Sequence, residues 1–167
     1  LHIDIQLNIK IYFYHLLLDN RLKILNQTKM DKQLSRYVLA GILGTIVMTL
    51  IMVMAPNLGM PEMAPWKLLA GAMGVPIVVG WIMHFVIGII FALGYGYLFA
   101  PNVIITNIWL KGIAFGIVAL ILAQIGMQVM GMMLEMPPVN GSMPMRLVAM
   151  LIGHLVFGVV TVKTIGK

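Results

Sequence analysis

Four long apolar runs constrain this chain more than any other feature of its sequence. A helix needs roughly 20 predominantly apolar residues to cross the hydrocarbon core of a membrane. The runs cover residues 37–55, 76–100, 112–134 and 147–163. The last run is short, but Arg146 and Lys163 can extend it because long basic side chains reach the headgroup region. The sequence therefore predicts an all-α fold, an integral membrane four-helix bundle.

Composition excludes a water-soluble domain. Charged residues make up 10% of the chain and hydrophobic residues 61%, whereas about a quarter of a typical soluble domain is charged. The net charge of +6 is spread thinly and contains no basic run, so we expect the lipid bilayer as partner and no nucleic acid. Because the chain has no cysteine, disulfides and thiolate metal sites are excluded.

Proline-containing connectors separate the runs, at 56–61, 101–102 and 137–141. Proline ends helices, so these segments predict turns. A ten-residue apolar stretch in the first connector, 66–75, is too short to span. We interpret it as an interfacial helix with Trp66 and Lys67 at the headgroup level.

The first 29 residues differ in composition from the rest. They contain no glycine and no methionine, while all 17 glycines and 16 methionines lie from Met30 onward. We hypothesise that the natural protein starts at Met30. Residues 1–29 would then be a non-native or disordered extension, and 30–167 the four-span domain. The alternative is a genuine amphipathic N-terminal segment.

The basic residues predict an orientation. From Met30 onward, five of them lie on one side of the predicted bundle and two lie on the other, together with both glutamates, Glu62 and Glu135. The two groups are Lys32, Arg36, Lys111, Lys163 and Lys167 against Lys67 and Arg146. The positive-inside rule then predicts that both termini lie in the cytoplasm.

Two segments of the chain resemble each other. Residues 84–88 (His-Phe-Val-Ile-Gly) match residues 154–158 (His-Leu-Val-Phe-Gly) at an offset of 70, and the connectors 57–61 and 140–144 are also similar. One interpretation is an internal repeat of two helical hairpins in the same orientation. The alternative is chance similarity between apolar helices.

Each predicted span carries a ridge of small or polar residues at a spacing of four. Helices in lipid associate through close backbone packing and interhelical hydrogen bonds, so these ridges are the expected seam of the bundle and a candidate contact for a homo-oligomer. In chain order they are Gly41, Thr45 and Thr49; Gly80, His84, Gly88, Ala92 and Gly96; Gly112, Gly116, Gln124 and Gln128; and Met150, His154 and Gly158.

The two histidines in these ridges, His84 and His154, are candidate functional residues. They lie at similar depth in spans that run the same way, and an ionisable group within a membrane is a functional-site candidate. Haem ligation by both imidazoles, with Gly88 and Gly158 making room for the macrocycle, is one hypothesis. A metal site or a proton relay is another. The third is a neutral histidine bonded to Gln124 or a threonine.

Methionine is distributed unevenly. Apart from Met30, all 15 methionines fall in the predicted outer half of the bundle or in the outer connectors. Thioethers are soft ligands suited to Cu(I), and methionine is also a flexible apolar filler. The candidate metal ligands are Met52, Met83, Met127, Met130 and Met150.

An enzyme is not indicated. No aspartate or glutamate lies in a span, and the two serines, Ser35 and Ser142, lie outside the spans. The sequence therefore offers no pair of carboxylates and no nucleophile near a base.

Several short motifs resemble those of a family of small bacterial four-span membrane proteins of unknown function. The motifs fall at residues 44–45, 48–49, 55–56, 69–74, 80–85, 109–112 and 154–156. The resemblance extends from Leu39 to the C-terminus and implies a helical inner-membrane protein. It implies no activity and no catalytic residues.

Two functional hypotheses follow. The first is a non-enzymatic helical bundle that acts as a transporter subunit or a membrane accessory protein. The alternative is a Cu(I)- or haem-binding membrane protein that uses His84, His154 and the methionines of the outer half.

Overall fold

The computed structural model describes residues 2–139 and 141–166, with side chains from Tyr14 onward in those ranges. Asn140, part of the repeated connector motif, and Leu1 and Lys167 lie outside the described residues. The chain divides into two compact units, one up to Ser35 and one from Arg36 onward.

The first unit consists of the N-terminal part of helix α1 (His2–Met54). The side chains described in it, from Tyr14 onward, are exposed almost throughout and form no apolar core. An ion pair between Lys23 and Asp19, at 2.9 Å, and a hydrogen bond from Ser35 to the Asp31 carbonyl oxygen link successive turns of the helix. Residues 2–29, for which we expected a non-native or disordered extension, are thus helical here. A natural start at Met30 stays a prediction.

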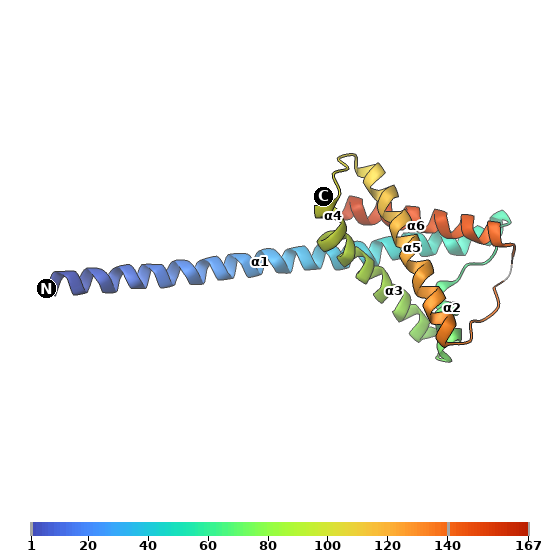
Figure 1. Cartoon of the computed structure of the whole chain (residues 1–167), viewed down its shortest axis with the longest axis horizontal. Helices are drawn as coiled ribbons and strands as arrows, with labels where there is room; N and C mark the ends of the chain where they lie inside the picture. Colours follow the sequence, from blue (N-terminus) through green and yellow to red (C-terminus); the bar gives the residue numbers. More distant parts are fainter. Residues whose placement is uncertain (1, 140, 167) are drawn as a thin grey trace. The chain divides into compact units, whose positions relative to one another are not determined.

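The second unit is built from helices (Figure 1). After residues 36–54 of α1, its elements are η1 (Ala55–Leu58), α2 (Pro65–Met73), α3 (Ile77–Gly94), the π-helical turn η2 (Tyr95–Phe99), α4 (Ala100–Asn102), α5 (Ile108–Met133) and α6 (Met143–Ile165). Four helices in the described part of the chain are long and apolar enough to cross a membrane. The predicted all-α fold, with four long apolar helices packed together and a short helix between the first two spans, is confirmed.

Two predicted helix starts were too late. The third span begins at Ile108 rather than 112, because the Asn107 side chain accepts hydrogen bonds from the backbone N–H groups of Trp109 and Leu110 at 2.9 and 3.2 Å. Such a cap starts a helix by satisfying donors that lack an intrahelical partner. The fourth span begins at Met143 rather than 147, with Pro144 in its first turn, where the missing proline N–H costs no hydrogen bond.

Helix α2 packs against α3. The Trp66 ring stacks on the Trp81 ring with 4.2 Å between centroids, and Gly80 lies directly under the backbone carbonyl of Trp66. Trp66 is therefore buried inside the protein, which corrects our expectation that its side chain faces the headgroups. Lys67 is exposed and pairs with Glu62 at 2.5 Å.

Helices α1 and α3 cross at glycines. A Cβ atom on Gly41 would lie 2.6 Å from the Ile89 Cα atom, and one on Gly88 would collide with the Thr45 hydroxyl. Farther along the same pair, a Cβ atom on Gly96 would lie 2.5 Å from the Tyr37 ring. Ala92, between Gly88 and Gly96 on the same ridge, is fully buried.

Helices α5 and α6 cross in the same manner. A Cβ atom on Gly112 would lie 2.7 Å from the Val159 Cα atom, and one on Gly116 would lie 2.5 Å from the His154 carbonyl oxygen. Gly158 on α6 faces the backbone of both α5 glycines. Helix α6 also lies beside the second half of α1, where Gly44 meets Phe157 and Thr161, and Gly153 meets Met52 (Figure 1).

The aromatic part of the core lies at the end of the unit that carries residue 36 and the C-terminal end of α6. Rings of α3, α5 and α6 and the π-helical turn meet there, with centroids 4.9 Å apart for Tyr95 and Phe115 and 6.4 Å for Phe91 and Phe157. We call this the Arg36 end, because the Arg36 side chain donates to the Ile165 carbonyl oxygen there. The opposite end, which carries η1, α2 and the start of α6, is the cavity end.

Candidate functional site

The cavity end contains a hollow of about 540 Å³. Side chains of α1, α2, α3, α5 and α6 line it, together with Met63 and Val139 from the connectors. The tight glycine crossings of α5 with α6 lie nearer the Arg36 end. The helices thus pack closely at one end and enclose space at the other.

Methionine dominates the wall of this cavity. Eight methionines line it: Met48, Met52, Met63, Met83, Met127, Met130, Met143 and Met150. The five that we singled out from the sequence are among them. Sequence reasoning grouped Met48, Met63 and Met143 with the other methionines in one half of the bundle but did not pick them out as candidate ligands. Because the thioether chain is flexible and polarisable, such a wall adapts its shape to a ligand.

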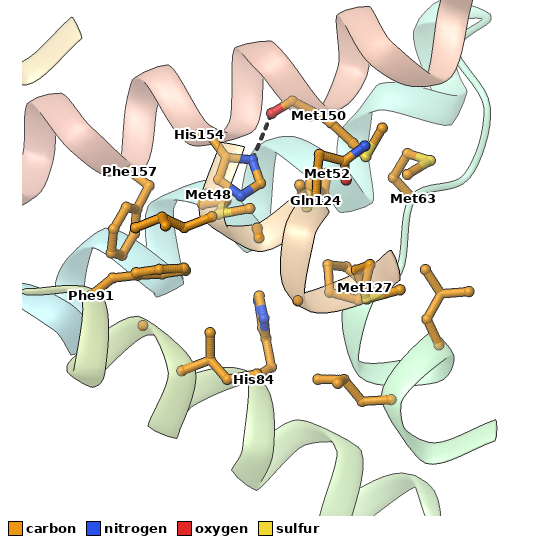
Figure 2. Close-up of a pocket in the computed structure, with 18 of the residues that line it drawn as sticks. Met48, Met52, Met63, His84, Phe91, Gln124, Met127, Met150, His154 and Phe157 are labelled. Carbon is orange, nitrogen blue, oxygen red and sulfur yellow. Dashed lines mark hydrogen bonds between the residues drawn. The ribbon is translucent and has the colours of Figure 1, made fainter. Parts of the chain in front are cut away.

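His84 reaches the cavity from α3 (Figure 2) and is 7% exposed. Its Nε2 atom lies 3.1 Å from the Thr49 hydroxyl of α1, and its ring centroid lies 5.9 Å from that of Trp66. Thr49 itself is not part of the wall and acts on the site through this hydrogen bond. The pairing of a histidine with a threonine across the bundle matches one of our three hypotheses for His84.

His154 enters from the opposite wall, on α6 (Figure 2). Its Nδ1–H donates to the Met150 carbonyl oxygen at 2.8 Å, since a carbonyl can only accept. In a neutral ring this fixes the tautomer and leaves Nε2 as an acceptor. His84 and His154 therefore line one cavity from two helices, each with one ring nitrogen held by the protein.

The other polar residues proposed from the sequence also lie at the wall. Gln124 and Gln128 line the cavity from α5, and Gln128 is largely exposed. Thr45 lines it from α1 and donates its hydroxyl proton to the Gly41 carbonyl oxygen at 2.7 Å. The polar ridges and the methionines thus converge on one site.

Arg146 is the cavity residue whose role sequence reasoning missed. We read it as a basic residue that extends a short span, yet it lines the cavity from the first turn of α6. Its Nη1 donates to the Val139 carbonyl oxygen at 3.3 Å and its Nη2 lies 3.2 Å from the Met143 sulfur. The sequence does contain one signal for such a role. A cation in the first turn of a helix is unfavourable because the helix dipole is positive there, so an arginine at this position suggests a function other than helix stabilisation.

The side chains that line the cavity can be compared with the ligands that Cu(I) and haem require. Among the described residues there is no group of three or more histidine, cysteine, aspartate or glutamate side chains that would hold a metal. A metal would depend on thioethers and imidazole nitrogen, a set suited to Cu(I). Haem held by both histidines does not fit, since Thr49 already engages the Nε2 atom of His84.

Comparison with known proteins identifies a family. Neither a search of curated proteins nor a search of solved structures found a match. A family of unknown function, DUF6789, matches residues 32–166, a range that includes the four apolar helices from residue 32 onward and every residue of the cavity wall. With four helices long and apolar enough to cross a membrane in its described part, the chain therefore belongs to the DUF6789 family, whose function is unknown.

Proposed function

We propose that this protein is a non-enzymatic transporter subunit or accessory protein of the bacterial inner membrane that binds a small lipophilic molecule in its cavity. The observation that carries the proposal is the cavity itself. Its volume of about 540 Å³ falls within the roughly 300–1,000 Å³ typical of ligand pockets. Like those pockets, it combines a mainly apolar wall with a few polar groups.

The chemistry of the wall supports binding over catalysis. Among the described residues that line the cavity there is no carboxylate, serine or cysteine. Its polar groups are two imidazoles, two amides, one threonine hydroxyl and one guanidinium. These groups orient a ligand by hydrogen bonds, whereas nucleophilic catalysis needs a nucleophile beside a base.

The helix crossings support the internal repeat. Gly88 packs on Gly41 and Thr45, and the equivalent Gly158 packs on Gly112 and Gly116. The contacts therefore recur at offsets of 70 on one helix and 71 on the other, as expected for two hairpins of common origin. We propose that the two hairpins form the cavity between them.

The basic residues support an orientation in the membrane, and the exposed side chains of α5 support a homo-oligomer. Arg36, Lys111 and Lys163 lie at the Arg36 end of the second unit. We therefore place this end in the cytoplasm and the cavity end on the outer side. We propose a homo-oligomer through the exposed side of α5 that carries Ile113, Ile117 and Ile121, because helices in lipid associate through close van der Waals packing.

The test is to identify small molecules that copurify with the protein from its native membrane. Ala123 lines the cavity from α5, so Ala123→Phe fills part of it. Ile125→Phe, on the exposed side of the same helix, is the matched control. We expect near-stoichiometric lipophilic material in the wild type and the control, and a loss of most of it in Ala123→Phe. Equal amounts in all three proteins would refute the proposal.

A second candidate function, Cu(I) binding, is favoured by the eight methionines that line the same cavity as His154, whose Nε2 atom has no hydrogen-bond partner among the described residues. Competition with a Cu(I) chelator measures it. We expect His154→Ala, and a variant with Met52, Met127 and Met150 changed to leucine, to weaken binding about tenfold or more. Met145→Leu, outside the cavity wall, is the control. Equal affinity in all variants would exclude this site.

A further inference from the structure

We propose that the ligand of the cavity is an anionic lipophile: an apolar body with a carboxylate or phosphate monoester head that binds Arg146. This inference rests on the function proposed above and adds the charge and the orientation of the ligand. It starts from the one guanidinium among the described residues of the cavity wall.

The Arg146 guanidinium has more N–H donors than described hydrogen-bond partners. Its two described partners, the Val139 carbonyl oxygen and the Met143 sulfur, both belong to residues of the cavity wall. These contacts hold the guanidinium at the end of the cavity formed by Val139, Met143 and Arg146, which we call the mouth. A guanidinium has five N–H donors. A neutral carbonyl and a thioether therefore leave most of its hydrogen-bonding capacity for a ligand.

The charge of Arg146 has no counterpart in the described structure. The ion pairs among the described side chains are Lys23–Asp19 and Lys67–Glu62, and neither involves Arg146. The first turn of α6 contains no acidic residue. The helix N-terminus adds positive potential at the same place. An anion at the mouth would be attracted by both, and the planar guanidinium suits two-point binding of a carboxylate or phosphate.

The rest of the cavity fits an apolar body. Along α6 its wall runs from Met143 to Phe157, a length of roughly 21 Å at 1.5 Å per residue. The far part of the wall is formed by Ile87, Phe91 and Phe157. A ligand anchored at Arg146 therefore extends past the methionines toward these aromatic rings. His84, His154 and Gln124, midway along, accommodate a hydrogen-bonding group in the body.

Binding of three probes with the same alkyl chain tests the inference. The probes are hexadecanoic acid, hexadecyl phosphate and the neutral hexadecanol, titrated into the full-length protein in an uncharged detergent and counted by native mass spectrometry. We expect at least one anion to bind about tenfold or more tightly than hexadecanol, the effect of hydrogen bonds to a charged group. Comparison of the two anions distinguishes a carboxylate from a phosphate ligand.

Arg146→Gln should remove this preference and leave the affinity for hexadecanol unchanged, which also shows that the variant is folded. Lys67→Gln, which removes an exposed charge of α2 outside the cavity wall, should keep the preference. If the anions and hexadecanol bind equally to the wild type, or if Lys67→Gln acts like Arg146→Gln, the role of Arg146 is refuted while the cavity proposal stands. If no probe binds, or if Ala123→Phe does not weaken binding, the lipophile-binding function fails with it.

Discussion

Replacement of Gly158 by alanine would separate two helices that touch through their backbones. The added Cβ atom would lie 2.6 Å from the Gly116 nitrogen and 2.7 Å from its Cα atom, and it would press on the Gly112 carbonyl oxygen. Real Cβ atoms do not approach other atoms this closely. Because all three neighbours are backbone atoms of α5, no side chain can rotate away, and α5 and α6 must move apart.

The magnitude follows from the nature of these neighbours. Insertion of one methyl group into a packed core costs about 1–3 kcal/mol. The cost is about 1 kcal/mol where neighbouring side chains can rotate away and about 3 kcal/mol where they cannot. We therefore expect Gly158→Ala to lower the free energy of unfolding by about 3 kcal/mol. Gly126→Ala on α5 is the matched control, because its Cβ atom would meet nothing within 4 Å.

Reversible unfolding in mixed micelles, with increasing dodecyl sulfate and helicity followed by circular dichroism, measures both variants. The control should be as stable as the wild type or more stable by up to about 1 kcal/mol, because its methyl group meets open space and alanine favours a helix over glycine. If Gly158→Ala falls within the same range, α5 and α6 are not held by direct backbone contact at Gly158, and the described crossing is wrong.

Three further substitutions test individual contacts in the same assay. Thr161→Val should be neutral or stabilise by up to about 1 kcal/mol, because the buried Thr161 hydroxyl oxygen has no hydrogen-bond partner among the described residues; destabilisation would reveal a partner. Thr49→Val removes the hydrogen bond to His84 and should cost about 0.6 kcal/mol, and no cost would show that this bond is not formed. Asn107→Ala removes the cap of α5 and should cost about 1 kcal/mol; an unchanged stability would show that another group caps this helix.

The fold was predictable because membrane solvation leaves few alternatives. Apolar length alone locates the four long helices. The glycines at the α1–α3 and α5–α6 crossings lie on ridges visible in the sequence, whereas Gly44 and Gly153, where α1 meets α6, do not. The ends of α5 and α6 were harder to locate. They depend on the Asn107 side chain and on Pro144, single residues that outweigh the apolar pattern. The π-helical turn Tyr95–Phe99 has no sequence signal that we can identify.

The cavity was predictable only in part. The uneven distribution of methionine indicated which half of the bundle differs from the other. It did not indicate which methionines share a wall, because helices that are apolar on every side give no periodicity to show their inward face. The place of Arg146 in the cavity wall was missed for a related reason. A basic residue at the end of a span serves equally well as a membrane anchor or as part of a site, and only the folded structure shows that Arg146 lies beside the cavity.

The contrast between the two ends of α5 and α6 has a mechanical consequence. Gly112, Gly116 and Gly158 bring the two backbones into direct contact, so the distance between α5 and α6 is fixed most tightly at this crossing. Toward the cavity end the same helices face flexible thioethers and empty space. A small change in the angle between α5 and α6 would keep the glycine contact and would move the cavity ends of the two helices more than the crossing itself. Such a change would widen or narrow the cavity at the end where Arg146 lies.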